Sequence, residues 1–209
     1  VRDPFGWVSL STQSMTLQGK QDAVGVWTSE REPRLARLGE SIGGGDGMDG
    51  AELGLLFTAL ASEFQGFSRD LHDETATEIM DLMTGLPLVL RSIAPMTAVQ
   101  RRALNRGSAT TRTVGEDFKL MGVSVWRLVQ RAERERYPLW RRALDDVHRI
   151  RNASVHANRS SLASLIEEGL VTWARWQAAK TMIGELVLGM DGAVTAYLRS
   201  VAMAEYSGG

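Results

Sequence analysis

The chain has 209 residues, of which 44% are hydrophobic, and it contains no cysteine. This length suffices for one well-buried domain plus extra segments, and the missing cysteines exclude disulfides, thiol catalysis and a cysteine-based zinc site. The formal net charge of −1 excludes a global basic field that would attract nucleic acid, so any such binding must rely on a local patch.

The first 50 residues lack the periodicity of a long helix. Residues 7–17, WVSLSTQSMTL, alternate briefly as a strand would, but no second strand is apparent to pair with them. Five glycines within residues 43–50 indicate a flexible linker. This segment is not a phosphate-binding loop, because the Gly-Lys-Ser/Thr ending is missing and no apolar strand precedes it. We expect residues 1–50 to form an N-terminal arm and linker, and residues 51–206 to form one domain.

Amphipathic helices dominate the chain after the linker. Apolar residues recur every three or four positions over residues 51–83, and a second such stripe runs over residues 115–135. Between the two stripes we expect a short helix over residues 96–106 and a polar loop over residues 107–113.

Two further helices are predicted in the last third of the chain. One begins near Pro138, where a proline fits the first helical turn. Residues 158–170 are expected to be a connection with about one helical turn. The last stripe runs from Trp173 to Val201, and its three glycines are expected to weaken the helix or to allow close packing. Together these patterns predict an all-α bundle of four main helices plus short helices, without a sheet.

Nothing in the sequence indicates export or a membrane anchor. No apolar run approaches the ~20 residues of a membrane span. The first residues, VRDPFGWVSL, lack the charged and then apolar layout of a secretory signal. We therefore expect a cytoplasmic protein that does not associate with a membrane.

An arginine, Arg151, stands in the apolar stripe of the helix that begins near Pro138. Trp140, Leu144 and Val147 define the centre of the apolar face, and Arg151 falls within roughly 20° of that centre. A charge turned inward is costly unless it is paired and hydrogen-bonded. Either the helix ends here, or the arginine has a buried acidic partner, or the face lines a polar cleft.

The spacing around Arg151 sets a further constraint. Asn152 and His156 are four residues apart and share one face of a helix. Arg151 and His156 are five residues apart, which separates them by about 140° around an ideal helix. For both to act on one atom, either the helix unwinds near Ser154 or a second copy of the chain supplies one of the two groups.

The six residues from Arg151 to His156, Arg-Asn-Ala-Ser-Val-His, resemble the Arg-polar-x-x-x-His motif of HEPN domains. Here the motif follows a long amphipathic helix in an all-helical chain and precedes one more long helix. Residues 63–74, EFQGFSRDLHDE, and the tryptophan-rich helix after the motif also look similar to bacterial HEPN-like proteins. The resemblance covers roughly residues 51–206 and does not extend to the first 50.

The resemblance implies a metal-independent endoribonuclease that acts as a toxin or phage-defence effector, or else a non-catalytic module that binds RNA, nucleotide or a partner protein. It implies a homodimer in which two motifs line one cleft, where the 2′-hydroxyl of RNA attacks the adjacent phosphate. His156 would be the acid–base group, Arg151 would stabilise charge on the phosphate, and Asn152 would orient one of them. No cofactor or metal is implied, whereas an antitoxin or the product of a neighbouring gene is an expected partner.

One HEPN subgroup differs from this chain in a way that bears on regulation. That subgroup, paired with nucleotidyltransferase antitoxins, carries a tyrosine two places after the histidine, and the partner modifies it. Here Asn158 stands at that place. Control through a modified tyrosine is therefore not implied.

Several charged residues near the motif are further candidates. Arg149, His148 and Arg159 are candidate substrate contacts, because cationic groups beside a cleft can track an RNA backbone. For His148 an ordinary surface position is favoured over a position in the cleft. Arginines between residues 127 and 142 extend this basic run, unless interleaved acids neutralise them. Glu63 is a candidate buried partner of Arg151.

Two more alternatives concern acidic residues and the overall role. Asp70, His72, Asp73 and Glu74 could suggest a metal site. Neither His72 nor Asp73 has the spacing of a metal ligand relative to Glu78, so a solvated acidic face is predicted there and no metal site. A purely structural helical protein is the third alternative for the function. It predicts a monomer in which an acid caps Arg151.

Overall fold

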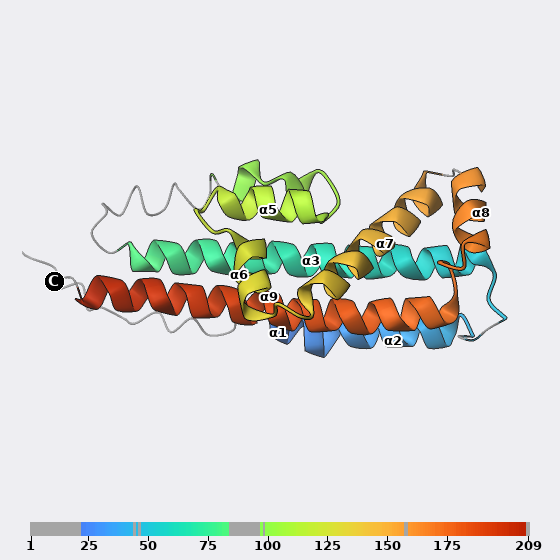
Figure 1. The fold of residues 1–209 in the computed structure, drawn as a ribbon, viewed down its shortest axis with the longest axis horizontal. Helices are drawn as coiled ribbons and strands as arrows, with labels where there is room; N and C mark the ends of the chain where they lie inside the picture. Colours follow the sequence, from blue (N-terminus) through green and yellow to red (C-terminus); the bar gives the residue numbers. More distant parts are fainter. Residues whose placement is uncertain are drawn as a thin grey trace, which may run out of the picture.

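The structure is a computed structural model that describes residues 22–43, 45, 47–83, 97, 99–156 and 159–207. Within these residues the chain forms eight α-helices, one π-helix (η1), one 3-10 helix (η2) and no strand (Figure 1). The prediction of an all-α fold is confirmed. The strand-like stretch at residues 7–17 lies outside the described residues.

Two long helices, α3 (Gly50–Leu82) and α9 (Trp173–Ser207), lie side by side along the long axis of the molecule (Figure 1). α3 begins with a capping box: the Asp49 side chain accepts the backbone N–H of Glu52, and the Glu52 side chain accepts that of Asp49. The largest buried side chains of α3 are those of Phe57, Phe64 and Phe67. Burying each of them contributes about 1.5–3 kcal/mol, so this face fixes α3 in the core.

A further layer of the bundle comes from the N-terminal part of the chain. It consists of α1, η1 and α2, which span Ala23–Val26, Trp27–Arg31 and Glu32–Ser41. Trp27 and Leu35 are each 1% exposed and belong to the same core as α3 and α9. Gly39 lies against Trp176 of α9, where an added Cβ would come within 3.0 Å of the indole ring. The expected N-terminal arm is therefore part of the bundle from residue 22 onward, and residue 50 does not separate two cores.

The stripe expected as one helix over residues 115–135 is two helices. They are α5 and α6, which span Thr111–Lys119 and Val125–Ala132. Gly122 lies in the turn between them with φ +77°, in the left-handed region that favours glycine. The Thr110 side chain caps α5, so the helix begins inside the loop expected over residues 107–113. The expected short helix before this loop is represented by η2 (Ala103–Asn105) and by helical residues 99–101.

The next two helices, α7 and α8, form one end of the molecule (Figure 1). α7 (Tyr137–Val155) crosses α3 and contains the stripe predicted from Pro138 onward. α8 (Arg159–Glu167) has nine residues, so the connection expected over residues 158–170 contains a longer helix than predicted. Leu165 is 2% exposed and anchors α8 on the core.

α9 is long and apolar enough over Trp173–Ala204 to cross a membrane, by length and composition alone. This differs from the expectation that no segment approaches a membrane span. One face of α9 is buried against α3, α6 and α7, with Trp176, Ile183 and Met190 at 0–1% exposed. Such a buried face is the pattern of a core helix in a bundle.

Candidate functional site

The Arg-Asn-x-x-x-His motif occupies the end of α7. Residues 151–155 are helical, and His156 is the C-cap residue, whose backbone N–H donates to the Asn152 carbonyl at 3.2 Å. Gly54 of α3 lets this end of α7 lie close, because a Cβ on Gly54 would come within 2.5 Å of the Ser154 Oγ. The helix therefore continues for about one turn past Arg151 and ends at the histidine, so the alternative in which it ends at Arg151 is wrong.

Arg151 is half-buried at the edge of the core, and its expected acidic partner lies elsewhere. Its Nη1 donates to Oδ1 of Asn152 at 3.0 Å, which places the guanidinium beside the amide. The expectation that Glu63 pairs with Arg151 is wrong. The Glu63 carboxylate instead accepts from Arg31 at 3.2 Å and from Arg34 at 2.8 Å. Both of these arginines belong to the N-terminal layer, where no helix was predicted, so the sequence carried no signal for this pairing.

A pocket of about 700 Å³ opens between α7 and α8 beside the motif. Its α7 wall is formed by Arg149, Asn152, Ala153 and His156, and its α8 wall by Ser160, Ser161, Ser164 and Leu165. Asn152 and His156 are exposed, so their polar groups meet solvent there. Arg151 is not among the lining residues but adjoins the pocket through its bond to Asn152. The structure thus gathers three predicted residues in one pocket and leaves Arg151 at its edge.

The rim of this pocket carries an ion pair. The Arg149 Nη2 lies 3.1 Å from Oε2 of Glu168, which follows α8, and both side chains are about half exposed. An exposed pair of this kind stabilises the fold by only ~0–1 kcal/mol. The Arg149 guanidinium can therefore exchange this carboxylate for another anion at small cost.

His148, expected either to contact substrate or to lie at the surface, does neither. It is 6% exposed, and its Nε2 lies 3.0 Å from the carbonyl oxygen of Ala109 in the loop before α5. Burial lowers the pKa of His148, the hydrogen bond to Ala109 acts against this, and the positive charge of Arg151 adds to the lowering. His148 is thus a buried core residue with a lowered pKa, and it ties α7 to the 107–110 loop.

The remaining candidate arginines lie on or beside α6, α7 and α8. Arg159 is the first residue of α8, but the position of its side chain lies outside what the structure describes, so its expected substrate contact stays a prediction. Six arginines on or beside α6 and α7 are exposed: Arg127, Arg131, Arg134, Arg136, Arg141 and Arg142. In the described part of the chain none of these six takes part in an ion pair. The interleaved acids therefore do not neutralise this run directly.

Residues 63–74 of α3, which resemble HEPN-like proteins, form a structural network rather than a solvated acidic face. Arg69 donates to the carbonyl oxygen of Leu104 at 2.6 Å, and Arg102 donates to Oδ1 of Asp73 at 2.5 Å. His72 is fully buried, with its ring at an edge of Phe118. These contacts hold the segment around η2 on α3. Across the described residues, no three His, Asp or Glu side chains are grouped so that they could hold a metal ion.

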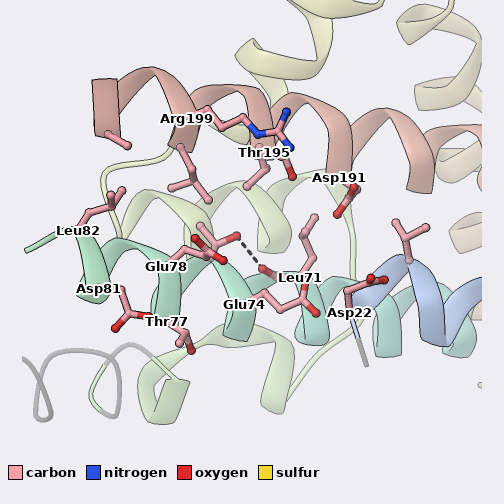
Figure 2. A pocket seen from close by; sticks show the side chains of 15 residues that line it. Asp22, Leu71, Glu74, Thr77, Glu78, Asp81, Leu82, Asp191, Thr195 and Arg199 are labelled. Atoms are coloured by element: carbon pink, nitrogen blue, oxygen red, sulfur yellow. Dashed lines mark hydrogen bonds between the residues drawn. The ribbon is translucent and has the colours of Figure 1, made fainter. Parts of the chain in front are cut away.

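A second pocket, of about 650 Å³, lies between the C-terminal halves of α3 and α9 (Figure 2). Its charged lining residues are Asp22, Glu74, Glu78, Asp81, Asp191 and Arg199. Burial raises the pKa of Asp191, and the nearby carboxylate of Asp22 adds to this. Five carboxylates against one guanidinium make this pocket repulsive to a phosphate, whereas no acid lines the α7/α8 pocket among the described residues.

The α7/α8 pocket offers chemistry suited to an anion. It combines an imidazole, an amide and three hydroxyls with a guanidinium, and a second guanidinium adjoins it. Imidazole exchanges protons near neutral pH, and guanidinium groups bind phosphate through paired donors. Comparisons of the chain with protein-family models, with curated proteins and with solved structures found no match.

Proposed function

We propose that this chain is a metal-independent endoribonuclease of the HEPN type, with an HEPN-like bundle, acting as a cytoplasmic homodimer in toxin–antitoxin or phage-defence systems. The observation that carries this proposal is the α7/α8 pocket, in which His156 and Asn152 meet Arg149 while Arg151 is bonded to Asn152 at the edge. The sequence singles out the same four positions. Three of them line one pocket and the fourth adjoins it, which supports a common task.

The proposed reaction is attack of RNA on its own backbone. His156 accepts the proton of a ribose 2′-hydroxyl while the 2′-oxygen bonds to the adjacent phosphorus. The bond from phosphorus to the 5′-oxygen breaks, and that oxygen takes up a proton, so the products are a 2′,3′-cyclic phosphate and a 5′-hydroxyl end. Arg151 stabilises the negative charge that develops on the phosphate oxygens, and Asn152 holds the guanidinium in place.

The proposed homodimer follows from the placement of these groups. Arg151 lies beside the pocket rather than in its lining, and about 140° of helix rotation separates it from His156. Two chains related by a two-fold axis would bring Arg151 of one subunit to His156 of the other. A site of this kind is incomplete in a single chain, so activity requires assembly.

The test compares wild type with the double variant Arg151→Ala/His156→Ala on a mixed RNA pool in EDTA. We expect new ends carrying 2′,3′-cyclic phosphate with wild type and none with the variant. Removing an acid–base group alone costs about 10²–10⁴-fold in rate. Arg175→Ala, which removes an exposed arginine of α9, is the matched control and should cut like wild type.

If wild type makes no such ends, the chain is better described as a non-catalytic HEPN-like module that binds RNA, nucleotide or a partner protein. That alternative predicts Arg151 in an ion pair with an acid such as Glu63 or Asp70. Both acids instead pair with Arg31, which supports the catalytic proposal. An active toxin would also need a silencing partner, and the product of the neighbouring gene is the first to examine.

A further inference from the structure

The α8 wall of the pocket consists largely of hydroxyl groups. Ser160 and Ser161 lie in its first turn, and Ser164 follows one turn later, so the three share the side of α8 that faces α7. Ser160 and Ser164 are exposed. A wall with three hydroxyls and no acid, opposite an arginine, is unlike an ordinary solvated helix face with mixed charges.

The groups that line the pocket favour a ligand that accepts hydrogen bonds and carries negative charge. A hydroxyl, an amide and a guanidinium all donate hydrogen bonds, and the first turn of a helix adds a positive partial charge. Arg149 is the one permanent cation among the described lining residues, and its exposed ion pair with Glu168 is readily exchanged. The volume of about 700 Å³ lies within the range of pockets that hold small molecules. The pocket therefore fits one hydroxylated, anionic group such as a nucleotide.

The position of Arg151 decides which part of the substrate lies here. In the proposed dimer the scissile phosphate contacts His156 of one subunit and Arg151 of the partner subunit. Because His156 lines the pocket and Arg151 of the partner subunit approaches from outside it, that phosphate lies at the edge of the pocket, beside His156. The interior of the pocket is then left for a different phosphate of the same strand.

We propose that Ser164, Ser160 and Ser161 of α8, together with Arg149, bind the phosphate of the nucleotide next to the scissile one. This inference rests on the proposed ribonuclease function and assigns a substrate-binding role to α8. When RNA binds, Arg149 leaves its ion pair with Glu168 and pairs with the phosphate instead. The serines then bind the RNA strand and fix which phosphate lies beside His156, while His156 and Arg151 act in the chemical step.

The experiment measures binding and cleavage separately. Binding uses a short 2′-O-methyl RNA, which cannot be cut because the attacking hydroxyl is blocked. We expect Ser164→Asp to weaken binding by tenfold or more, and Ser160→Ala/Ser161→Ala by about tenfold, because hydrogen bonds to a charged group are lost or replaced by repulsion. Ser200→Asp places the same charge on an exposed serine of α9 outside the pocket and should bind like wild type.

Salt dependence identifies the phosphate contact. The slope of log affinity against log salt concentration is negative for RNA binding. Arg149→Gln should make this slope shallower by about 0.7, the value for one phosphate of a single strand. Ser164→Ala should weaken binding without changing this slope. In cleavage assays the serine variants should raise KM and leave kcat close to that of wild type.

The outcomes separate this inference from the proposed function. Cleavage by wild type with unchanged KM and affinity in the Ser164→Asp variant would overturn the α8 subsite and leave the ribonuclease intact. Loss of oligonucleotide binding in Ser164→Asp, in a chain that never cuts RNA, would keep the subsite and remove the ribonuclease. Wild-type binding of inorganic phosphate but not of the oligonucleotide would also overturn the subsite, because the pocket would then serve a free anion.

Discussion

His148 and His156 lie two turns apart on α7 in opposite environments. His148 is enclosed in the core and hydrogen-bonded to Ala109, whereas His156 is exposed at the mouth of the α7/α8 pocket. Only the exposed histidine can exchange a proton with a bound substrate. The buried one contributes by fixing the end of α7, and therefore the orientation of Arg151 and Asn152.

The lowered pKa of His148 predicts a pH-dependent stability. In the unfolded chain the group titrates near its usual pKa of 6.5, whereas in the folded chain it stays neutral to lower pH. Below about pH 6.5 the unfolded state therefore binds more protons, and the free energy of unfolding falls as the pH falls, by at most about 1.4 kcal/mol per pH unit. We expect His148→Gln, which keeps a donor for Ala109 but does not titrate, to flatten this dependence.

The measurement for this prediction is urea unfolding of both proteins between pH 5 and pH 8, conditions that bracket the titration of an unperturbed histidine. The two proteins should converge at the acid end even if the variant is less stable at neutral pH. Equal slopes of the free energy of unfolding against pH in the two proteins would show that His148 does not contribute to the pH dependence of stability.

At the scale of elements, the closeness of helix pairs depends on a few glycines. Gly54 lets α7 approach α3 beside the motif, and Gly189 lets α9 approach Trp140 of α7. A Cβ on Gly189 would lie 2.7 Å from the indole ring, while Gly192, one turn away on the same helix, has open space around it. Two of the three glycines predicted to weaken α9 or permit packing thus differ completely in their surroundings.

This contrast predicts opposite effects for two similar substitutions. Gly192→Ala should stabilise the protein by about 0.5–1 kcal/mol, because alanine favours the helix and meets no neighbour. Gly189→Ala gains the same helix preference but must displace Trp140, and overpacking of this kind costs about 1–3 kcal/mol. We therefore expect a net loss of stability for Gly189→Ala. The thermal unfolding midpoints of the two variants, each compared with wild type, measure both effects.

An equal rise in midpoint for both alanine variants would contradict this account. It would mean that α7 and α9 can separate slightly without cost. The indole of Trp140 also donates to Glu185 at 3.0 Å, so such a separation would have to preserve or replace that hydrogen bond.

At the scale of the whole molecule, the two ends have opposite chemical character. The α7/α8 end holds the pocket with donor groups, and the C-terminal halves of α3 and α9 hold the acidic pocket (Figures 1 and 2). The net charge of −1 is a sum over the whole chain and does not report this local difference. The proposed function therefore places RNA at the α7/α8 end through local charge and not through an overall field.

The proposed dimer makes a prediction that concerns two chains at once. Arg151→Ala and His156→Ala should each be inactive alone. If one site combines Arg151 of one chain with His156 of the other, mixing the two variants restores an intact site in each heterodimer, and about a quarter of the wild-type rate should return. Cleavage assays on the separate and mixed proteins, after exchange of subunits, measure this directly.

The control is a mixture of each variant with the double variant, which contains no complete pair in any dimer formed by opposite chains. Activity that remains absent in the mixture of single variants, with heterodimers present, would place both groups of a site in one chain. A monomer that cuts RNA at full rate would remove the need for a dimer altogether.

The sequence by itself determined the fold class and the extent of α3, and it indicated the end of α7 as the candidate site. These features depend on local spacing, such as the apolar stripe of α3, which a single segment contains. The local pattern failed where α5 and α6 continue the same spacing across Gly122, because a turn need not interrupt a periodicity. It failed also for the N-terminal layer, whose burial depends on α3 and α9.

Only the tertiary structure decided which of the candidate residues share a site. Glu63 binds Arg31 and Arg34, His148 turns into the core, and Arg149 joins Asn152 and His156 at a pocket whose second wall is α8. Each of these outcomes depends on how helices from distant parts of the chain meet. A partner for a charge is chosen by distance in space, and spacing along one helix contains no information about what the neighbouring helix presents.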